Sequence, residues 1–419
     1  MKSKYALFVS IIALLIALTS CTILQETSPK PVENAITSSP ELPTEDETEI
    51  PVETDVPTAT ETETVTATEP VTSPLPTSPG PVIFALSMHS TTHGWAVTRD
   101  GNSLLVTQDG GETWLDATPP GLHPLPADIS SLGIHPFFLN ESTAWFSPFT
   151  AGTGSLYHTQ DGGESWITSA PPFGNARYFF LDENVGYGFV DLGAGAGSHY
   201  VALYRTLDGG NTWLEMFTHE PGESKSLPEG GSKNGVTFLD VDNGWVGGSI
   251  PMEDYFYLHY TTDGGITWSL ETDISLPAAY AGSFLDVWQP VFVDATSAYL
   301  PVRAVLSGGD LALLIYRSHD SGDSWVFRNA VVDGNAVDFV SVDEGFAAAD
   351  SGLFHTTDGG LNWLALLNSG IPAGSVFLKV DFVDSQHGWV ITTPDDFTWE
   401  PLELYRTEDG GASWVKLLP

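Results

Sequence analysis

One eight-residue phrase occurs seven times in this chain and constrains its fold more than any other feature. The phrase is Thr/Ser-x-Asp-x-Gly-x-Thr/Ser/Asn-Trp, and its aspartates lie 38 to 57 residues apart. A repeat of this period indicates an array of similar structural units. The aspartates of the seven copies are Asp109, Asp161, Asp208, Asp263, Asp320, Asp358 and Asp409.

The repeated unit is longer than the phrase. A small residue followed by an aromatic one precedes each copy, as in Gly94-Trp95 and Gly186-Tyr187, and an apolar run lies further upstream. Each unit therefore contains four short strands, which is typical of a propeller blade. We predict an all-β fold, a seven-bladed β-propeller of four-stranded blades over residues 82–419. Both ends keep the same phase, so we expect the ring to close by packing between the first and last blades.

The N-terminal part of the chain has a different composition. Residues 1–21 combine Lys2 and Lys4, the apolar run Ala6 to Leu18, and a lipobox-like end at Cys21. This order is typical of a bacterial lipoprotein signal peptide, in which the cysteine is lipidated. Residues 22–81 are rich in Thr, Pro and Glu and are predicted to be a disordered linker. The sequence thus predicts an extracytoplasmic protein that touches the membrane only through its lipid.

The charge of the chain limits the classes of partner it can bind, and its cysteine content excludes a disulfide. Asp and Glu outnumber Lys and Arg by 54 to 14, and the net charge is −40. Nucleic acids and anionic membrane surfaces require basic patches, so neither is an expected partner. Cys21 is the only cysteine, so no intrachain disulfide can form. We expect a monomer.

The repeated phrase itself is predicted to be a tight turn between the third and fourth strands. Its Asp can accept backbone N–H groups, its Gly allows a positive φ angle, and its Trp can pack against the neighbouring blade. The alternative is calcium binding, but calcium prefers six to eight oxygens and each copy supplies one carboxylate. Because a catalytic group is needed once rather than seven times, we predict structural aspartates, no catalytic residue, no metal and no cofactor.

These units resemble the Asp-box, or sialidase-type, repeats, and the resemblance covers all seven blades. The fuller phrase at 403–414 and 203–213 is most similar to the photosystem II assembly factor family. That resemblance implies a non-enzymatic scaffold for membrane protein assembly. The family uses a basic patch for its partner, whereas this propeller has only 11 Lys and Arg residues.

A sialidase would need three arginines that clamp a carboxylate, the first in an early strand. The matching strand here, 82–88, has no arginine. Arg205, Arg317 and Arg406 precede boxes and are predicted to be structural. An active sialidase is therefore disfavoured.

Long and variable loops are expected on the face opposite the boxes, where function usually lies. Exposed aromatic residues there would suit sugar stacking or a protein hot spot, or would simply pack the loops down. Two carboxylates at a suitable distance could instead hydrolyse a glycoside. Arg177, on an innermost strand, could anchor an anion or pair with a carboxylate. The candidate binding residues are Trp288, Trp399, Tyr255, Phe256, Tyr280, Phe397, Asp395, Asp396 and Arg177.

Two functional hypotheses follow. The first is a surface-anchored propeller that binds an envelope or surface protein as a scaffold or assembly factor. The alternative is an extracellular glycan-binding protein or a glycoside hydrolase with a sialidase-like propeller.

Overall fold

The computed structural model describes residues 81–99, 103–122, 136–148, 154–219, 226–251, 253–269, 272–394 and 401–418. The predicted signal peptide with Cys21, and the predicted linker up to residue 80, lie outside these residues. Within the described part, no helix has the length and apolar character needed to cross a membrane.

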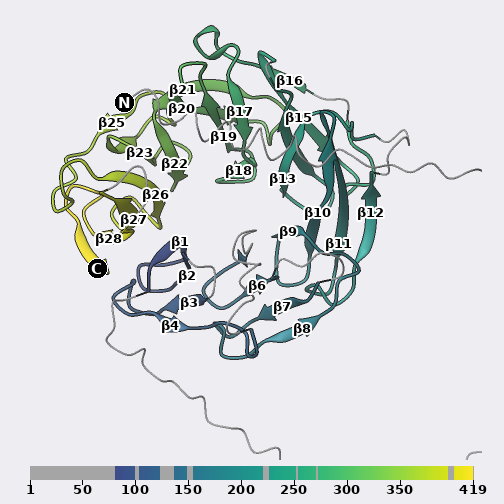
Figure 1. Cartoon of the computed structure of the whole chain (residues 1–419), viewed down its shortest axis with the longest axis horizontal. Coiled ribbons are helices and arrows are strands. Elements are labelled where there is room, and N and C mark those ends of the chain that lie inside the picture. The colour runs from purple at the N-terminus through teal and green to yellow at the C-terminus, as the bar shows by residue number, and fades with distance from the viewer. Residues whose placement is uncertain are drawn as a thin grey trace, which may run out of the picture. The chain divides into compact units, whose positions relative to one another are not determined.

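Seven antiparallel sheets are arranged around a central channel, and each consists of consecutive strands (Figure 1). This confirms the predicted all-β, seven-bladed propeller. Blades 1 to 3 contain β1 (Ile83–Met88), β2 (Gly94–Thr98), β3 (Leu104–Thr107), β4 (Leu115–Asp116), β5 (Phe137–Phe138), β6 (Ala144–Phe146), β7 (Leu156–Thr159), β8 (Ile167–Ser169), β9 (Ala176–Phe180), β10 (Gly186–Gly195), β11 (Ser198–Thr206) and β12 (Leu214–Thr218).

The fifth blade differs from the others because its innermost strand is interrupted and forms β17 and β18, which both pair with β19. A short 3₁₀ helix, η1 (Ala278–Tyr280), precedes it. Blades 4 to 7 contain β13 (Ser232–Phe238), β14 (Gly244–Ser249), β15 (Tyr255–Thr261), β16 (Thr272–Ser275), β17 (Phe284–Val287), β18 (Val291–Phe292), β19 (Ala298–Val305), β20 (Leu311–Ser318), β21 (Val326–Val332), β22 (Gly334–Phe339), β23 (Gly345–Ala349), β24 (Gly352–Thr356), β25 (Leu364–Ala365), β26 (Val376–Phe382), β27 (Gly388–Thr393), β28 (Glu403–Thr407) and β29 (Val415–Leu418).

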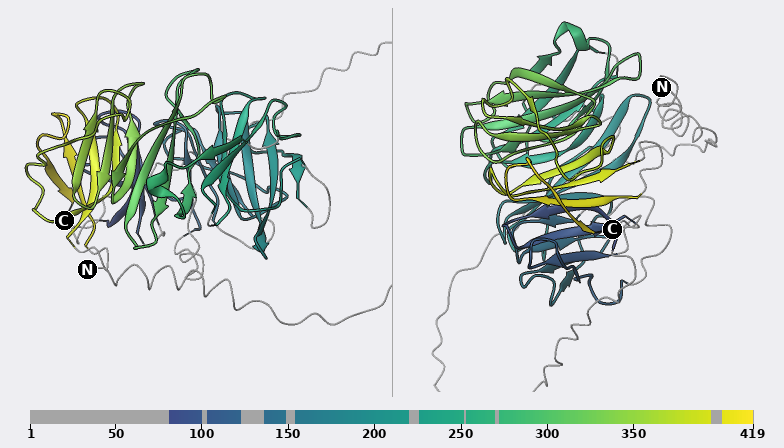
Figure 2. Two further views of the ribbon diagram at one scale, coloured as in Figure 1. Left: turned by 90° about the horizontal axis from the view of Figure 1, so that it is seen from above. Right: turned by 90° about the vertical axis from the view of Figure 1, so that its left-hand side faces the viewer.

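The two faces of the ring differ in their connections, and Figure 2 shows the blades edge-on. In every blade, an amide of the box donates to a carbonyl in the turn between the first two strands, as in Gly110 N to Thr92 O at 2.8 Å. The boxes and these turns therefore share one face, here called the box face. The remaining connections lie on the opposite face, here called the loop face.

Each box, the repeated eight-residue phrase, is held together by hydrogen bonds between its own residues. In the first copy, Asp109 Oδ1 accepts from the Thr107 hydroxyl at 2.9 Å and from the Thr113 amide at 2.8 Å. Its Oδ2 accepts from the Thr113 hydroxyl at 2.5 Å, and Gly110 and Gly111 adopt φ angles of 75° and 91°. The other six copies repeat the carboxylate contacts. Both carboxylate oxygens are thus engaged inside the turn.

Packing between blades depends on the box tryptophan and on the small-plus-aromatic step. Trp114 of the first blade shares a buried cluster with Trp389 and Leu404 of the seventh. The step aromatic stacks on the inner-strand aromatic of the next blade, as Tyr187 does on Phe238, with ring centroids 3.5 Å apart. The predicted role of the box tryptophan as a wedge between blades is therefore confirmed at this seam.

The ring closes between blades 7 and 1 without strand exchange, as expected. Asp381 Oδ2 accepts from the Met88 amide at 2.8 Å, and Trp389 Nε1 donates to the Gly110 carbonyl at 2.8 Å. Side-chain packing and these hydrogen bonds therefore hold the two ends of the propeller together.

Candidate functional site

The inner strands of five blades surround a cavity of about 720 Å³ in the central channel. Most of its wall is apolar, which is typical of sites that bind an organic ligand or an apolar side chain. It is lined by Pro136, Phe137, Arg177, Tyr178, Phe179, Phe180, Leu181, Gly235, Val236, Thr237, Phe238, Leu239, Trp288, Gln289, Pro290, Val291, Phe292, Pro301 and Val337.

Trp288 lies in this wall, at the interruption between β17 and β18. Its amide donates to the Pro301 carbonyl at 3.1 Å, and its Nε1 donates to Asp286 Oδ2 at 3.2 Å. The indole is half-buried against the core cluster between blades 5 and 6. The structure therefore places Trp288 in the channel wall, on the segment between β17 and β18, whereas the sequence analysis expected it on the loop face.

Arg177 lines the same cavity from β9, the innermost strand of blade 3. Its Nη1 donates to the main-chain oxygen of Asn234 in blade 4. The same oxygen accepts from Gln289 Nε2 at 2.6 Å. The sequence left two roles open for Arg177, an anchor for an anion or a partner for a carboxylate. The hydrogen bond that the structure shows goes to neither group but to a main-chain carbonyl.

Asn234 connects this group to blade 5. Its Nδ2 donates to Asp286 Oδ1 at 3.0 Å and to the Val287 carbonyl at 2.9 Å. Asn335 repeats the arrangement in blade 6, where its Nδ2 donates to the Phe377 carbonyl of blade 7 at 2.9 Å. These two asparagines fix the inner strands of neighbouring blades relative to each other and so shape the cavity wall.

The predicted exposed aromatics on the loop face need correction. Phe256 has no exposed surface, and its ring packs edge-on against Tyr316 at 5.0 Å, so its assignment as a binding residue was wrong. The strand β15 begins at Tyr255, one residue before Phe256, and the alternation of a strand turns Phe256 into the blade. Tyr255 is half-buried.

Tyr280 belongs to η1 and is half-buried. Its ring lies 6.4 Å from that of Phe327, and burial raises the pKa of its hydroxyl. Tyr280 therefore packs its loop against blade 5, which is the alternative that the sequence left open. The predicted site residues Asp395, Asp396, Phe397 and Trp399 lie outside the described residues, and so does Cys21.

Sequence reasoning missed two buried aspartates on the innermost strands of blades 6 and 7. Asp338 Oδ2 accepts from the Phe382 amide at 2.7 Å, and Asp381 makes the equivalent contact to Met88 in the next blade. Burial raises the pKa of Asp338 to about 6. Burial and the nearby Asp338 raise the pKa of Asp381 well above its usual value. An alignment of the seven inner strands would have revealed them, because the equivalent positions elsewhere include Phe137 and Thr237.

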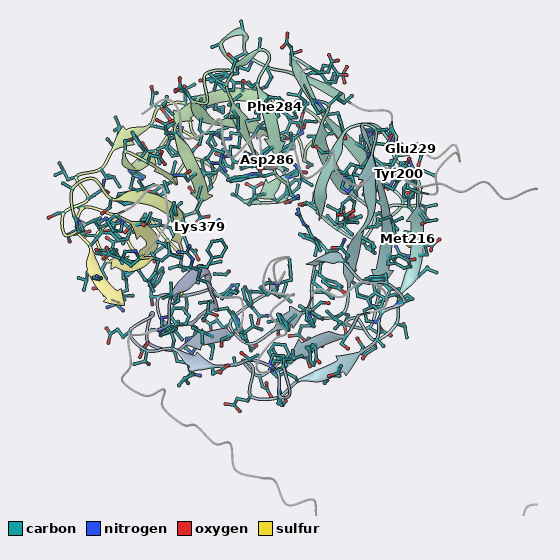
Figure 3. All side chains as sticks on the ribbon, in the orientation of Figure 1. Tyr200, Met216, Glu229, Phe284, Asp286 and Lys379 are labelled. Atoms are coloured by element: carbon teal, nitrogen blue, oxygen red, sulfur yellow. The ribbon has the colours of Figure 1, made fainter. Side chains whose placement is uncertain are left out.

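A buried lysine on the loop face was also missed. Lys233 is 3% exposed, and its Nζ donates to the carbonyls of His199, Glu229 and Gly230 at 3.1–3.3 Å. Burial lowers its pKa to about 8. The three contacts fix the long β10–β11 hairpin against the segment before β13, and Figure 3 marks Glu229 beside Tyr200 of that hairpin.

Comparison with known proteins agrees with the fold. The BNR/Asp-box repeat family model matches residues 259–270. The photosystem II assembly protein Ycf48 of Synechococcus sp. (strain JA-2-3B'a(2-13)) is 26% identical over 326 residues, which cover 74% of this chain and 83% of that protein. The photosystem II assembly lipoprotein Ycf48 of Synechococcus sp. (strain CC9902) is 23% identical over 262 residues, or 57% of this chain and 73% of the relative.

A solved structure described as YCF48 bound to D1 peptide superimposes with a TM-score of 0.50 and 18% identity. The match covers 80% of this chain and 95% of that one. The chain is therefore an Asp-box repeat propeller with a distant relationship to the Ycf48 photosystem II assembly factors.

Proposed function

We propose that this chain is a non-enzymatic, lipid-anchored propeller that holds a segment of an envelope or membrane protein while that protein assembles. The observation that carries the proposal is the cavity of about 720 Å³ in the channel, with Trp288, Gln289 and Arg177 in its wall. A tryptophan and an arginine at a concave, mostly apolar surface are the residue types that dominate protein-binding hot spots.

Two further findings support this choice. The relatives at 23% and 26% identity are described as assembly proteins, and the similar solved propeller is described as bound to a peptide. The seven box aspartates use both carboxylate oxygens within their own turns, so the repeated acids serve the architecture. The partner that this site fits best is a flexible peptide segment that can enter the channel.

The proposal is tested by affinity capture from solubilised native envelopes, with the tagged full-length chain as bait and mass spectrometry as readout. We expect stoichiometric recovery of one membrane protein or complex. Trp288→Ala should reduce its recovery at least tenfold, because a central tryptophan commonly contributes about 2 kcal/mol or more to binding. Trp399→Ala, at the second candidate tryptophan, should also weaken recovery.

Tyr280→Ala is the matched control, since it removes an aromatic ring that packs a loop outside the cavity. All three variants must keep the circular dichroism spectrum of the parent. Equal recovery by Trp288→Ala and the parent would remove the channel from the proposal. Recovery of polysaccharide, or of nothing above background, would favour the glycan-binding alternative.

The proposed location rests on Cys21 and on the description of one relative as a lipoprotein. Lipidation of Cys21 would place the propeller outside the cytoplasm, on a tether of about sixty residues. Cys21→Ser should move the protein from the membrane fraction to the soluble fraction and abolish incorporation of labelled palmitate. Retention of Cys21→Ser in membranes would contradict lipid anchoring.

A further inference from the structure

Large apolar side chains are exposed on the innermost strands of blades 1 and 5. Val82 and Phe84, on either side of the first residue of β1, are 44% and 43% exposed. Val291 of β18, which lines the channel cavity, is 53% exposed. Exposed apolar surface that gathers in one region usually marks a place where another segment docks.

Phe84 occupies a position at which two other blades have asparagine. It lies in an inner-strand bulge, three residues before the residue opposite the step aromatic, and Asn234 and Asn335 lie at the same place in blades 4 and 6. Each asparagine donates to a main-chain carbonyl of the next blade at 2.9 Å. A phenyl ring cannot donate this hydrogen bond, so Phe84 does not serve the contact that holds these neighbouring blades together.

The chain enters the propeller at the same place. β1 begins at the loop face, because its other end leads into the turn that the Gly110 amide contacts on the box face. β1 is also the innermost strand of its blade, and Figure 1 shows it at the inner rim of the ring. The residues that precede Val82 therefore join the ring at the loop-face mouth of the channel.

The sequence just before this mouth differs from the rest of the predicted linker. Residues 72–80 read Thr-Ser-Pro-Leu-Pro-Thr-Ser-Pro-Gly, with three prolines, one leucine and no charge. The 12 acidic residues of the linker all lie between positions 26 and 69. Burial of an unpaired charge in an apolar cavity is costly. The neutral segment 72–80, here called the strap, is therefore the part of the linker that suits the channel cavity.

The strap is long enough to reach the cavity. Proline-rich segments favour the polyproline II helix, which rises about 3.1 Å per residue, so nine residues extend about 28 Å. Phe179 and Val291 in the cavity wall lie at the level of Ser87 in β1, because all three are opposite a step aromatic. This level is three residues, or about 10 Å, further into the channel than Phe84.

The wall of the cavity carries the residue types that bind proline-rich segments. Trp288, Phe137 and Phe179 contribute aromatic rings to it. Proline-rich peptides dock in aromatic-lined grooves, because their polyproline conformation exists before binding and little entropy is lost. The composition of the strap therefore matches the composition of the cavity.

We propose that the strap turns back into the channel and occupies the cavity, with Leu75 against Trp288 and Val291. Gly80-Pro81 is a dipeptide typical of turns and supplies the reversal. Because the strap belongs to the same chain, its effective concentration at the cavity is on the order of a millimolar, and even weak binding keeps the cavity filled. A client must then displace the strap, a consequence that rests on the proposed function.

Photo-cross-linking in the full-length chain tests where the strap lies. Leu75 is replaced by p-benzoylphenylalanine, and the products of irradiation at low protein concentration are mapped by mass spectrometry. We expect cross-links within one chain to the cavity wall, at residues such as Trp288 and Pro290. Ile50 also precedes a proline but lies in the acidic part of the linker, so the same replacement there is the matched control and should give at least tenfold fewer. Equal yields from both positions, cross-links outside the cavity or products that join two chains would overturn the proposal.

A second measurement uses the strap as a free peptide. A fluorescein-labelled peptide with the sequence of residues 72–80 is titrated with the full-length chain, whose own strap competes for the cavity. Leu75→Asp in the chain removes this competitor, so that variant should bind the peptide at least tenfold more tightly than the parent. Equal binding by the parent and by Leu75→Asp would count against the strap.

A charge in the cavity wall checks that the peptide binds there. Val291→Asp, added to Leu75→Asp, should abolish the tight binding, and the exposure of Val291 lets the fold accept the charge. Val326→Asp is the control, since Val326 is exposed on the outermost strand of the same blade, and it should leave peptide binding unchanged. Equal losses in the two variants would contradict binding in the cavity.

The envelope capture experiment keeps this inference distinguishable from the proposed function. Leu75→Asp should recover more client than the parent, because its cavity is open. If no client is recovered but Leu75 cross-links to the cavity, the scaffold function fails and the strap stands. If a client is recovered and the cross-links miss the cavity, the scaffold function stands and the strap fails.

Discussion

At the scale of single residues, the small position before each step aromatic controls how tightly neighbouring blades stack. The position that matters is the one in the receiving blade, opposite its inner-strand phenylalanine. Where it is glycine, the step aromatic of the preceding blade lies on that phenylalanine with centroids 3.5–3.6 Å apart and rings within 8° of parallel. Where it is Ala144 or Ala298, the corresponding pairs lie at 5.4 and 5.0 Å. A methyl group at this position therefore displaces the ring.

This correlation predicts the effect of adding a methyl group at Gly244. A Cβ there would lie 2.6 Å from the Phe238 ring, which stacks on Tyr187. Gly244→Ala should lower the free energy of unfolding by about 1–3 kcal/mol, the usual cost of overpacking, as measured by urea denaturation. Gly195→Ala is the control, since a Cβ at Gly195 meets no atom within 4 Å. An unchanged midpoint for Gly244→Ala would refute the steric explanation.

At the scale of the structural element, the box is an autonomous turn whose hydrogen bonds span only a few residues. In the fifth copy, Asp320 accepts from the Ser324 amide at 2.9 Å and from the Ser324 hydroxyl at 2.6 Å. The hydrogen bond from the Ser324 hydroxyl holds the pKa of Asp320 below its usual range. A lowered native pKa stabilises the fold above the unfolded pKa, near 4, and this contribution is lost as the pH falls further.

Removal of one carboxylate from this turn should therefore have a local effect. Asp320→Ala leaves the Ser324 amide and hydroxyl without their acceptor, and we expect a loss of about 1–2 kcal/mol together with faster amide exchange between β20 and β21. Asp323→Ala in the same box removes an equal charge from an exposed position and is the matched control. Equal exchange in the two variants would show that the box carboxylate does not hold the turn.

At the scale of the whole molecule, Asp338 and Asp381 connect the last blades to the first. Their contacts run from blade 6 to blade 7 and from blade 7 to blade 1, across the seam where the last blade meets the first. Because burial raises their pKa values, these groups bind protons in the native state more tightly than in the unfolded state. Their ionisation therefore destabilises the ring as the pH rises.

The direction of this effect gives a prediction for Asp338→Asn. The native pKa of about 6 lies above the unfolded value near 4, so the penalty is absent below pH 4 and complete above pH 6. The variant should be more stable than the parent by about 1–3 kcal/mol at pH 7.5 and equal to it at pH 4, since an amide oxygen can still accept from Phe382. Denaturant unfolding at both pH values measures this, with Asp310→Asn as an exposed control. A variant less stable at pH 7.5 would contradict a raised pKa.

The sequence by itself determined the number of blades, their four strands, the face that carries the boxes and the absence of strand exchange at the seam. These features follow from contacts between residues close in the sequence, such as the hydrogen bond from the Thr113 amide to Asp109. They also follow from repetition, because seven copies of one pattern give the same fold even if one copy is misinterpreted. The burial of Phe256 was misjudged because the side on which a residue lies depends on where the strand begins.

Only the tertiary structure decided which residues meet in the channel wall. Arg177 and Gln289 come from blades two positions apart, yet both donate to the main-chain oxygen of Asn234, and neither belongs to the repeated phrase. Trp288 lies in the cavity wall because the innermost strand of blade 5 is interrupted between β17 and β18. This interruption occurs in one blade, so the repeated pattern does not predict it. A repeat specifies what its copies share through short-range hydrogen bonds, whereas a binding site in a ring arises from the positions at which the copies differ and from the closure that brings them together.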